Sequence, residues 1–161
     1  MNLQTEQLSD STSASHRFRV RCAGAAFLSL LLGLATRRPG LFPGEALANT
    51  AGGALYVLFG VLLLCTLFPR RAGGTRRRRT ITVGAVTLAT CAIEFSQLWS
   101  PGFLEAVRAT LPGRLVLGTT YSSADFLGYF VGAIFSAVVL GILAKTAAPR
   151  SRRPTLEAPR T

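Results

Sequence analysis

The sequence predicts an all-α, polytopic membrane protein with four transmembrane helices. Hydrophobic residues make up 49% of its 161 residues, and they gather in four long runs. Each run approaches the roughly 20 apolar residues that a spanning helix needs. All eight prolines lie outside these runs, as expected for residues that break helix interiors. The 18 Lys and Arg residues far outnumber the 7 Asp and Glu residues and lie mostly between the runs.

The runs divide the chain into three parts. Residues 1–15 are polar and rich in Ser and Thr, which is typical of a disordered tail. The transmembrane domain covers residues 16–146, and a basic disordered tail covers residues 147–161. The predicted helices lie at about residues 20–36, 46–68, 80–98 and 123–144.

The first run also has the basic flank and short apolar core of a cleaved signal peptide. A cleavage site of small residues lies near Ala48, but Arg37, Arg38 and two prolines separate it from the apolar core. This distance favours a retained first helix.

Arginine counting predicts that both termini lie in the cytoplasm, because cytoplasmic loops carry an excess of Lys and Arg. With the N terminus inside, thirteen basic residues close to the ends of the runs fall on the cytoplasmic side and four on the outer side. The thirteen are Arg17, Arg19, Arg21, Arg70, Arg71, Arg76, Arg77, Arg78, Arg79, Lys145, Arg150, Arg152 and Arg153, and the four are Arg37, Arg38, Arg108 and Arg114.

The arginine-rich segment RRAGGTRRRR also resembles a nucleic-acid-binding signal. Between two apolar runs, however, the favoured role is a topology anchor that meets anionic lipid head groups, so no nucleic-acid partner is expected. Cys22, Cys65 and Cys91 lie in or beside apolar runs and have no metal-ligand spacing. His16 is the one histidine. We therefore expect helix-packing cysteines, no metal site and no cofactor.

Polar residues follow one face of three predicted helices, and they are richest at the outer end. Glu94 and Gln97 lie three apart near the end of the third helix, which places them on one face. Trp99 follows, where aromatic residues mark the membrane boundary. On the second predicted helix this face carries Glu45, Asn49, Gly53, Tyr56 and Gly60. On the fourth it carries Asp125, Gly128, Tyr129, Gly132 and Ser136.

The second outer loop predicts a short amphipathic helix over residues 103–111, with Phe103, Leu104, Val107 and Leu111 on one face. A turn at Pro112-Gly113 and an extended segment are expected to follow. This loop would let Arg108 and Arg114 reach the carboxylates. The candidate outer site consists of Glu45, Glu94, Gln97, Arg108, Arg114 and Asp125. Ionisable groups at membrane depth favour a functional site, and inter-helix bonds that fix the packing are the alternative.

Three stretches carry a family resemblance: GEALANTAGGALYVLFG, AIEFSQLW and FLEAVRATLPGRLVLGTTYSSADFLGYFVG. They resemble the small bacterial membrane proteins called domain of unknown function 2809, over about residues 28–140. That family has four helices and often an Asp where this chain has Glu45. Its other motif positions correspond here to Glu94 and Gln97, Arg108 and Thr110, Leu117 and Gly118, and Asp125, Tyr129 and Gly132.

The same order of residues is more distantly similar to VanZ-like proteins, whose namesake is associated with resistance to the glycopeptide teicoplanin. The outer cluster of carboxyl groups and arginines favours a multi-pass protein of the cell membrane that binds or modifies a lipid-linked envelope component. Glu94 and Asp125 would then be the candidate catalytic groups, and whether the protein is an enzyme stays open. The candidate binding residues are Glu45, Gln97, Arg108, Arg114 and Tyr129. The alternatives are a structural membrane partner and a small transporter or channel subunit, and an oligomer is also left open.

Overall fold

A computed structural model describes residues 3–38, 40, 43–98, 101–117 and 125–147 of the chain. Throughout these residues the regular structure is helical, so the all-α prediction is confirmed for them. Residues 148–161 of the predicted C-terminal tail and Trp99 lie outside the described residues, whereas Ala147 ends the last helix. The helices are α1 (Leu3–Ala35), α2 (Glu45–Leu67), α3 (Pro69–Ala72), α4 (Arg76–Ser96), α5 (Gly102–Ala109), α6 (Leu111–Leu117) and α7 (Asp125–Ala147).

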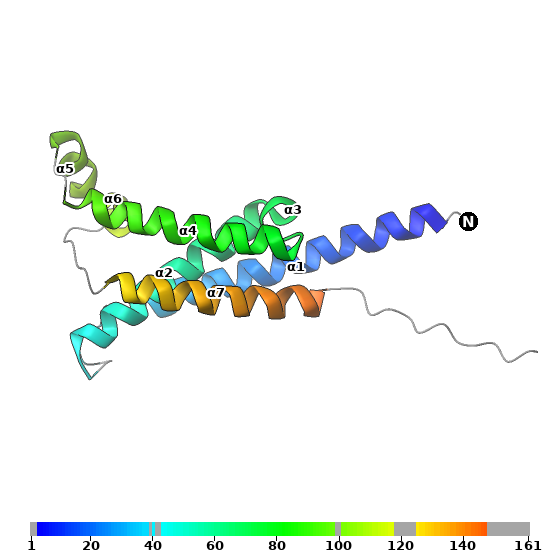
Figure 1. The fold of residues 1–161 in the computed structure, drawn as a ribbon, viewed down its shortest axis with the longest axis horizontal. Helices are drawn as coiled ribbons and strands as arrows, with labels where there is room; N and C mark the ends of the chain where they lie inside the picture. The colour runs from blue at the N-terminus through cyan, green and yellow to red at the C-terminus, as the bar shows by residue number, and fades with distance from the viewer. Residues whose placement is uncertain (1–2, 39, 41–42, 99–100, 118–124, 148–161) are drawn as a thin grey trace, which may run out of the picture.

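The four long helices form an elongated bundle in which successive helices run in opposite directions (Figure 1). The central helix is α2, which packs along both α1 and α7, while α4 packs against α7 and α2. The bundle has two distinct ends. We call one the arginine-rich end, formed by α3, the start of α4 and the end of α7. We call the other the α5–α6 end, where α5 and α6 lie beyond the end of α4 (Figure 1).

Three helices are long and apolar enough to cross a membrane: Thr12–Ala35 within α1, and all of α2 and α7. This property supports a membrane protein, because a spanning helix needs about 20 mostly apolar residues. The fourth long helix, α4, covers most of the run predicted at residues 80–98 but is not among the three. It begins with four consecutive arginines and contains Glu94, which lower its apolar character.

The first helix is longer than its apolar run. It begins at Leu3, whereas the sequence predicts a disordered tail over residues 1–15 and a helix from residue 20. Once a helix has formed, each added residue costs little, so the polar segment extends the helix that the apolar run establishes. At 1.5 Å per residue, α1 is about 50 Å long, and its N-terminal part projects beyond the other helices (Figure 1).

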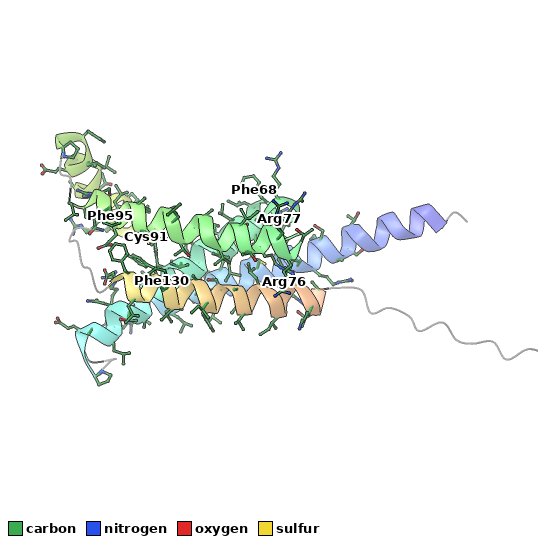
Figure 2. The ribbon with its side chains drawn as sticks, in the orientation of Figure 1. Phe68, Arg76, Arg77, Cys91, Phe95 and Phe130 are labelled. Carbon is green, nitrogen blue, oxygen red and sulfur yellow. The ribbon has the colours of Figure 1, made fainter. Side chains whose placement is uncertain are left out.

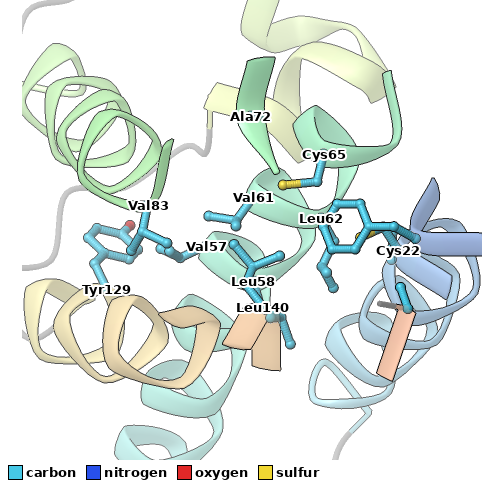
Figure 3. Packing of buried hydrophobic residues seen from close by; sticks show 13 residues of the cluster. Cys22, Val57, Leu58, Val61, Leu62, Cys65, Ala72, Val83, Tyr129 and Leu140 are labelled. Carbon is cyan, nitrogen blue, oxygen red and sulfur yellow. The ribbon is translucent and has the colours of Figure 1, made fainter. Parts of the chain in front are cut away.

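The apolar core centres on α2. Its buried residues are Val57, Leu58, Val61, Leu62 and Cys65, and they meet residues of α1, α4 and α7 (Figure 3). The thiols of Cys22 and Cys65 are free, and both side chains are fully buried. Cys91 is free and half-buried. The first two therefore pack as small apolar groups, as predicted.

Two glycines bring α7 into backbone contact with α2. A Cβ atom at Gly128 would lie 2.7 Å from the Thr50 carbonyl oxygen, and one at Gly132 would lie 2.7 Å from that of Ala54. Cβ atoms do not approach a carbonyl so closely, so only glycine fits here without moving the helices. This GxxxG pair therefore lets the backbones of α2 and α7 approach closely.

The α5–α6 segment differs in one respect from the prediction. The first part is a helix, but the chain turns at Thr110 and not at Pro112-Gly113, and α6 replaces the start of the expected extended segment. The Thr110 hydroxyl accepts a bond from the Gly113 N–H at 3.1 Å, as a helix N-cap does. Pro112 then lies in the first turn of α6, where its missing N–H costs nothing.

Candidate polar site at the α5–α6 end

The candidate site centres on a buried carboxylate in α4. Glu94 is 2% exposed although it lies close to the end of its helix at Ser96. The Tyr129 hydroxyl, from α7, donates a hydrogen bond to Glu94 Oε2 at 2.7 Å. Tyr129 is itself 7% exposed. Two residues that are 35 positions apart in the sequence thus form a buried pair between α4 and α7.

Aromatic rings flank this pair. The centroids of Phe95 and Phe126 are 5.3 Å apart, and those of Phe126 and Tyr129 are 5.9 Å apart with an edge-on arrangement. Such tilted and edge-on pairs are favourable for aromatic rings. Phe95 lies on α4 near the α5–α6 end, one turn after Cys91 (Figure 2). The rings lower the polarity around the Glu94–Tyr129 pair, which strengthens its hydrogen bond.

Gln97 and Arg108 hold α4 to the segment beyond it. Gln97 follows the last residue of α4, and its Nε2 donates to the Leu117 carbonyl at the end of α6, at 2.7 Å. Arg108, on α5, donates from Nη2 to the Ser96 carbonyl at 2.8 Å. Both acceptors are carbonyls at helix C termini, which lack a partner within their own helix. These two side chains therefore satisfy helix ends that would otherwise face an apolar environment.

Tyr56 makes a third contact of the same kind. Its hydroxyl, on α2, donates to the Val116 carbonyl in the last turn of α6 at 3.0 Å. A further constraint lies at Gly113, where a Cβ atom would collide with the Val107 carbonyl of α5. The α5–α6 segment is thus bonded to α4 and α2 and folded tightly on itself.

The remaining predicted residues lie at different depths. Asp125 begins α7, one turn before Tyr129, and its side chain is half-buried. Glu45 begins α2 and is exposed, and that end of α2 diverges from α4 (Figure 1). Arg114 is exposed on α6. Of the predicted set, the structure brings Glu94 and Tyr129 into direct contact, with Gln97, Arg108 and Asp125 around them, and leaves Glu45 and Arg114 at the surface.

The arrangement suits binding or proton transfer by one carboxyl group. A carboxylate accepts hydrogen bonds from a ligand hydroxyl or amide, and the Tyr129 hydroxyl can orient it. Within the described part of the chain, no group of three or more His, Cys, Asp and Glu residues has the placement to hold a metal ion.

Several partners at this end were missed from the sequence. Ser96, Phe95 and Phe126 contribute contacts, and the carbonyls of Val116 and Leu117 accept them. Phe126 stands three residues before Tyr129, so helical spacing could have suggested it. The backbone acceptors had no sequence signal, because any residue provides a carbonyl.

A known protein family matches more than half of the chain. The family model described as "Protein of unknown function (DUF2809)" matches residues 43–133. These residues run from just before α2 to the Gly132 turn of α7, and they include all the side chains of the candidate site. No solved structure matches the chain.

Proposed function

The chain belongs to the DUF2809 family of proteins of unknown function, and from this premise we propose that it is a four-span membrane protein with an outward-facing binding site at Glu94. The ligand class that we propose is a lipid-linked component of the cell envelope. The observation that carries the proposal is the buried carboxylate of Glu94 with its 2.7 Å bond from Tyr129. An acidic group at membrane depth is expensive and usually marks a ligand or proton pathway.

The internal bonding of α4 supports its role as the fourth span. The hydroxyls of Thr82, Thr87 and Thr90 each donate to the carbonyl four residues earlier, at 2.8–2.9 Å. A hydroxyl that is bonded within its own helix can enter a membrane at low cost. The four arginines at the start of α4 then belong at the cytoplasmic boundary, and Glu94 near the outer one.

The position of the site supports a ligand that arrives through the outer leaflet. Glu94 and Gln97 lie within about one turn of the end of α4, so a head group can reach them without crossing the bilayer. Arg108 is next to them, and arginine suits phosphate and carboxylate groups. An enzymatic step is a further option for Glu94 or Asp125, in which one of them would act as general acid or base.

The proposal is tested by identifying the lipids that copurify with the protein. Wild type and Glu94→Gln are purified in a mild detergent, and bound lipids are identified by mass spectrometry and compared with the bulk membrane. The amide oxygen of the substituted side chain can still accept the Tyr129 bond, so this change removes the charge and keeps the packing. We expect one lipid-linked species to be enriched at least tenfold on wild type and lost on Glu94→Gln.

The matched control is Glu105→Gln, which removes an exposed carboxylate from α5. It should retain the enriched lipid. Equal lipid profiles for wild type and Glu94→Gln, at equal protein yield, would exclude a ligand-binding role for the Glu94 charge.

A structural role is the second candidate, and specific contacts favour it for part of the cluster. Gln97, Arg108 and Tyr56 all bond backbone carbonyls at helix ends. If packing is the whole role of the cluster, Gln97→Ala would lower the amount of folded protein, and Glu94→Gln, which keeps the packing, would leave both the yield and the bound lipids unchanged. Loss of the enriched lipid from Glu94→Gln at normal yield, with reduced yield of Gln97→Ala, would instead separate a binding residue from a packing residue.

A further inference from the structure

The arginine-rich end carries a basic surface assembled from several helices. The sequence predicted that basic residues of the first and last helices lie on the same side as the arginine-rich loop, and in the structure the basic segment of α1 and the end of α7 lie at the end formed by α3 and the start of α4 (Figure 1). Figure 2 shows Arg76 and Arg77 there. The exposed basic side chains of this surface are Arg17, Arg19, Arg21, Arg71, Arg76, Arg77, Arg78 and Lys145.

Apolar contacts beneath the surface hold its parts together. The ring of Phe18, on α1, occupies the space where a Cβ atom of Gly73 would be. Phe18, Ala72 and Ala147 are all buried and belong to one apolar cluster. Phe18 lies between the basic residues of α1, while Ala72 and Ala147 end α3 and α7. The basic residues of α1, α3, α4 and α7 are therefore fixed relative to one another.

The sequence places no acidic residue inside this surface. No Asp or Glu occurs between residues 11 and 44 or between residues 46 and 93. The nearest acidic position of α1 is Asp10, about 10 Å along the helix from Arg17. Four of the arginines also stand in the first turn of α4, where the helix dipole disfavours cations. An external anion would relieve both the repulsion among the basic side chains and the unfavourable interaction of the arginines with the helix dipole.

Large exposed apolar residues border this basic surface. Val20, Phe68 and Ile81 are 56%, 51% and 58% exposed and stand next to the basic residues. Exposed apolar groups of this size belong in lipid, and long basic side chains beside them reach the head groups. Exposed apolar and exposed basic side chains thus lie close together along the chain at this end.

We propose that the arginine-rich end binds the head groups of anionic phospholipids, through a surface that α1, α3, α4 and α7 build together. The proposal deepens the four-span arrangement proposed above. It rests on that arrangement because the arrangement determines on which side of the membrane the arginine-rich end lies. A bilayer is favoured over a nucleic acid because exposed apolar residues, among them Val20, Phe68 and Ile81, lie close to the arginines in the chain. Phosphate groups match the guanidinium donors, and the attraction falls with salt.

The test is a lipid titration of the full chain in neutral detergent, followed by native mass spectrometry. Phosphatidylglycerol and phosphatidylcholine with the same acyl chains are the probes. We expect phosphatidylglycerol to bind at least tenfold more tightly, with the preference reduced as salt rises. Arg76→Gln/Arg77→Gln should weaken phosphatidylglycerol binding about tenfold or more and leave phosphatidylcholine unchanged, because each surface arginine contributes about fivefold.

The matched control is Arg37→Gln/Arg38→Gln, a second exposed arginine pair just after the opposite end of α1. It should leave the preference intact. The proposal would be overturned if the two lipids bound equally or if the two double variants had equal effects. It would also be overturned if a single-stranded RNA bound more tightly than phosphatidylglycerol at about 0.15 M salt. If Arg76→Gln/Arg77→Gln lowers the melting temperature, Arg71→Gln on α3 repeats the measurement.

The titration also separates this proposal from the one on Glu94. Binding in detergent micelles does not depend on whether α4 crosses a bilayer, and Glu94 lies at the other end of α4. A failure to find the phosphatidylglycerol preference would therefore not change the copurified-lipid result at Glu94. A failure to find a copurified lipid would likewise not change the phosphatidylglycerol result.

Discussion

At the scale of single residues, Glu94 and Tyr129 have a clear physical relation. Both are buried, and the phenol donates to the carboxylate across the α4–α7 interface. A hydrogen bond of this kind gains strength from its apolar surroundings. The pair therefore joins two helices whether or not the carboxylate also binds a ligand.

Tyr129→Phe tests this bond. The change keeps the ring and its contact with Phe126 but removes the hydroxyl, so we expect the free energy of unfolding to fall by about 1 kcal/mol. Unfolding in mixed detergent and SDS micelles measures it.

The control for this prediction is Tyr56→Phe, which removes an exposed bond to the Val116 carbonyl. Water can replace that donor, so the free energy of unfolding should fall by less than it does for Tyr129→Phe. A larger loss for Tyr56→Phe than for Tyr129→Phe would contradict the assignment of the stronger bond to the buried pair.

At the scale of elements, the close contact between α7 and α2 depends on glycine. Gly128 and Gly132 leave space for the backbone of Thr50 and Ala54. Within a membrane, where apolar side chains are equally at home in lipid, such close packing is a main source of helix association.

Gly132→Ala should disrupt this contact. Its Cβ would lie 2.7 Å from the Ala54 carbonyl oxygen and 3.0 Å from Val57 Cβ, so the helices must separate. We expect a loss of roughly 1–3 kcal/mol in the free energy of unfolding, measured in mixed micelles.

Gly141→Ala provides the matched control on the same helix, because a Cβ there meets nothing within 4 Å. It should be neutral or stabilising, since alanine favours a helix more than glycine does. Equal destabilisation by the two changes would mean that the α2–α7 contact is not the reason for the glycine.

The short helices show where local sequence signals are incomplete. The amphipathic pattern suggested one helix over residues 103–111, whereas α5 ends at Ala109, and Pro112-Gly113 suggested a turn where the chain begins α6. Proline is compatible with both a turn and the first turn of a helix. The N-cap at Thr110 and the bonds from Tyr56 and Gln97 to α6 depend on neighbours that are distant in the sequence.

At the scale of the whole molecule, the two ends of the bundle differ in chemistry. One end is basic, and the other contains the buried carboxylate and the α5–α6 segment. With four spans, these ends would lie on opposite sides of the membrane, the basic end in the cytoplasm.

Cysteine labelling tests this arrangement. Glu105→Cys on α5 and Arg77→Cys on α4 place single thiols at exposed positions of the two ends. We expect a membrane-impermeant maleimide to label the first in intact cells and the second only after permeabilisation. Both variants also carry Cys91→Ala, which removes the half-buried native thiol. The chain with Cys91→Ala alone gives the background, which should be low because Cys22 and Cys65 are fully buried. Labelling of both positions under the same condition would exclude α4 as a span.

The order of apolar runs, prolines and arginines was sufficient to predict an all-α membrane protein, and three motif stretches were sufficient to suggest its family. These features are local or compositional, so they can be read along the chain. The partners of those residues were decided by the tertiary structure alone. Tyr129 reaches Glu94 because α7 packs beside α4, and Gln97 and Tyr56 bond α6 carbonyls because the chain folds back at Thr110. Contacts between distant segments depend on how the helices pack, and a backbone carbonyl gives no signal in the sequence.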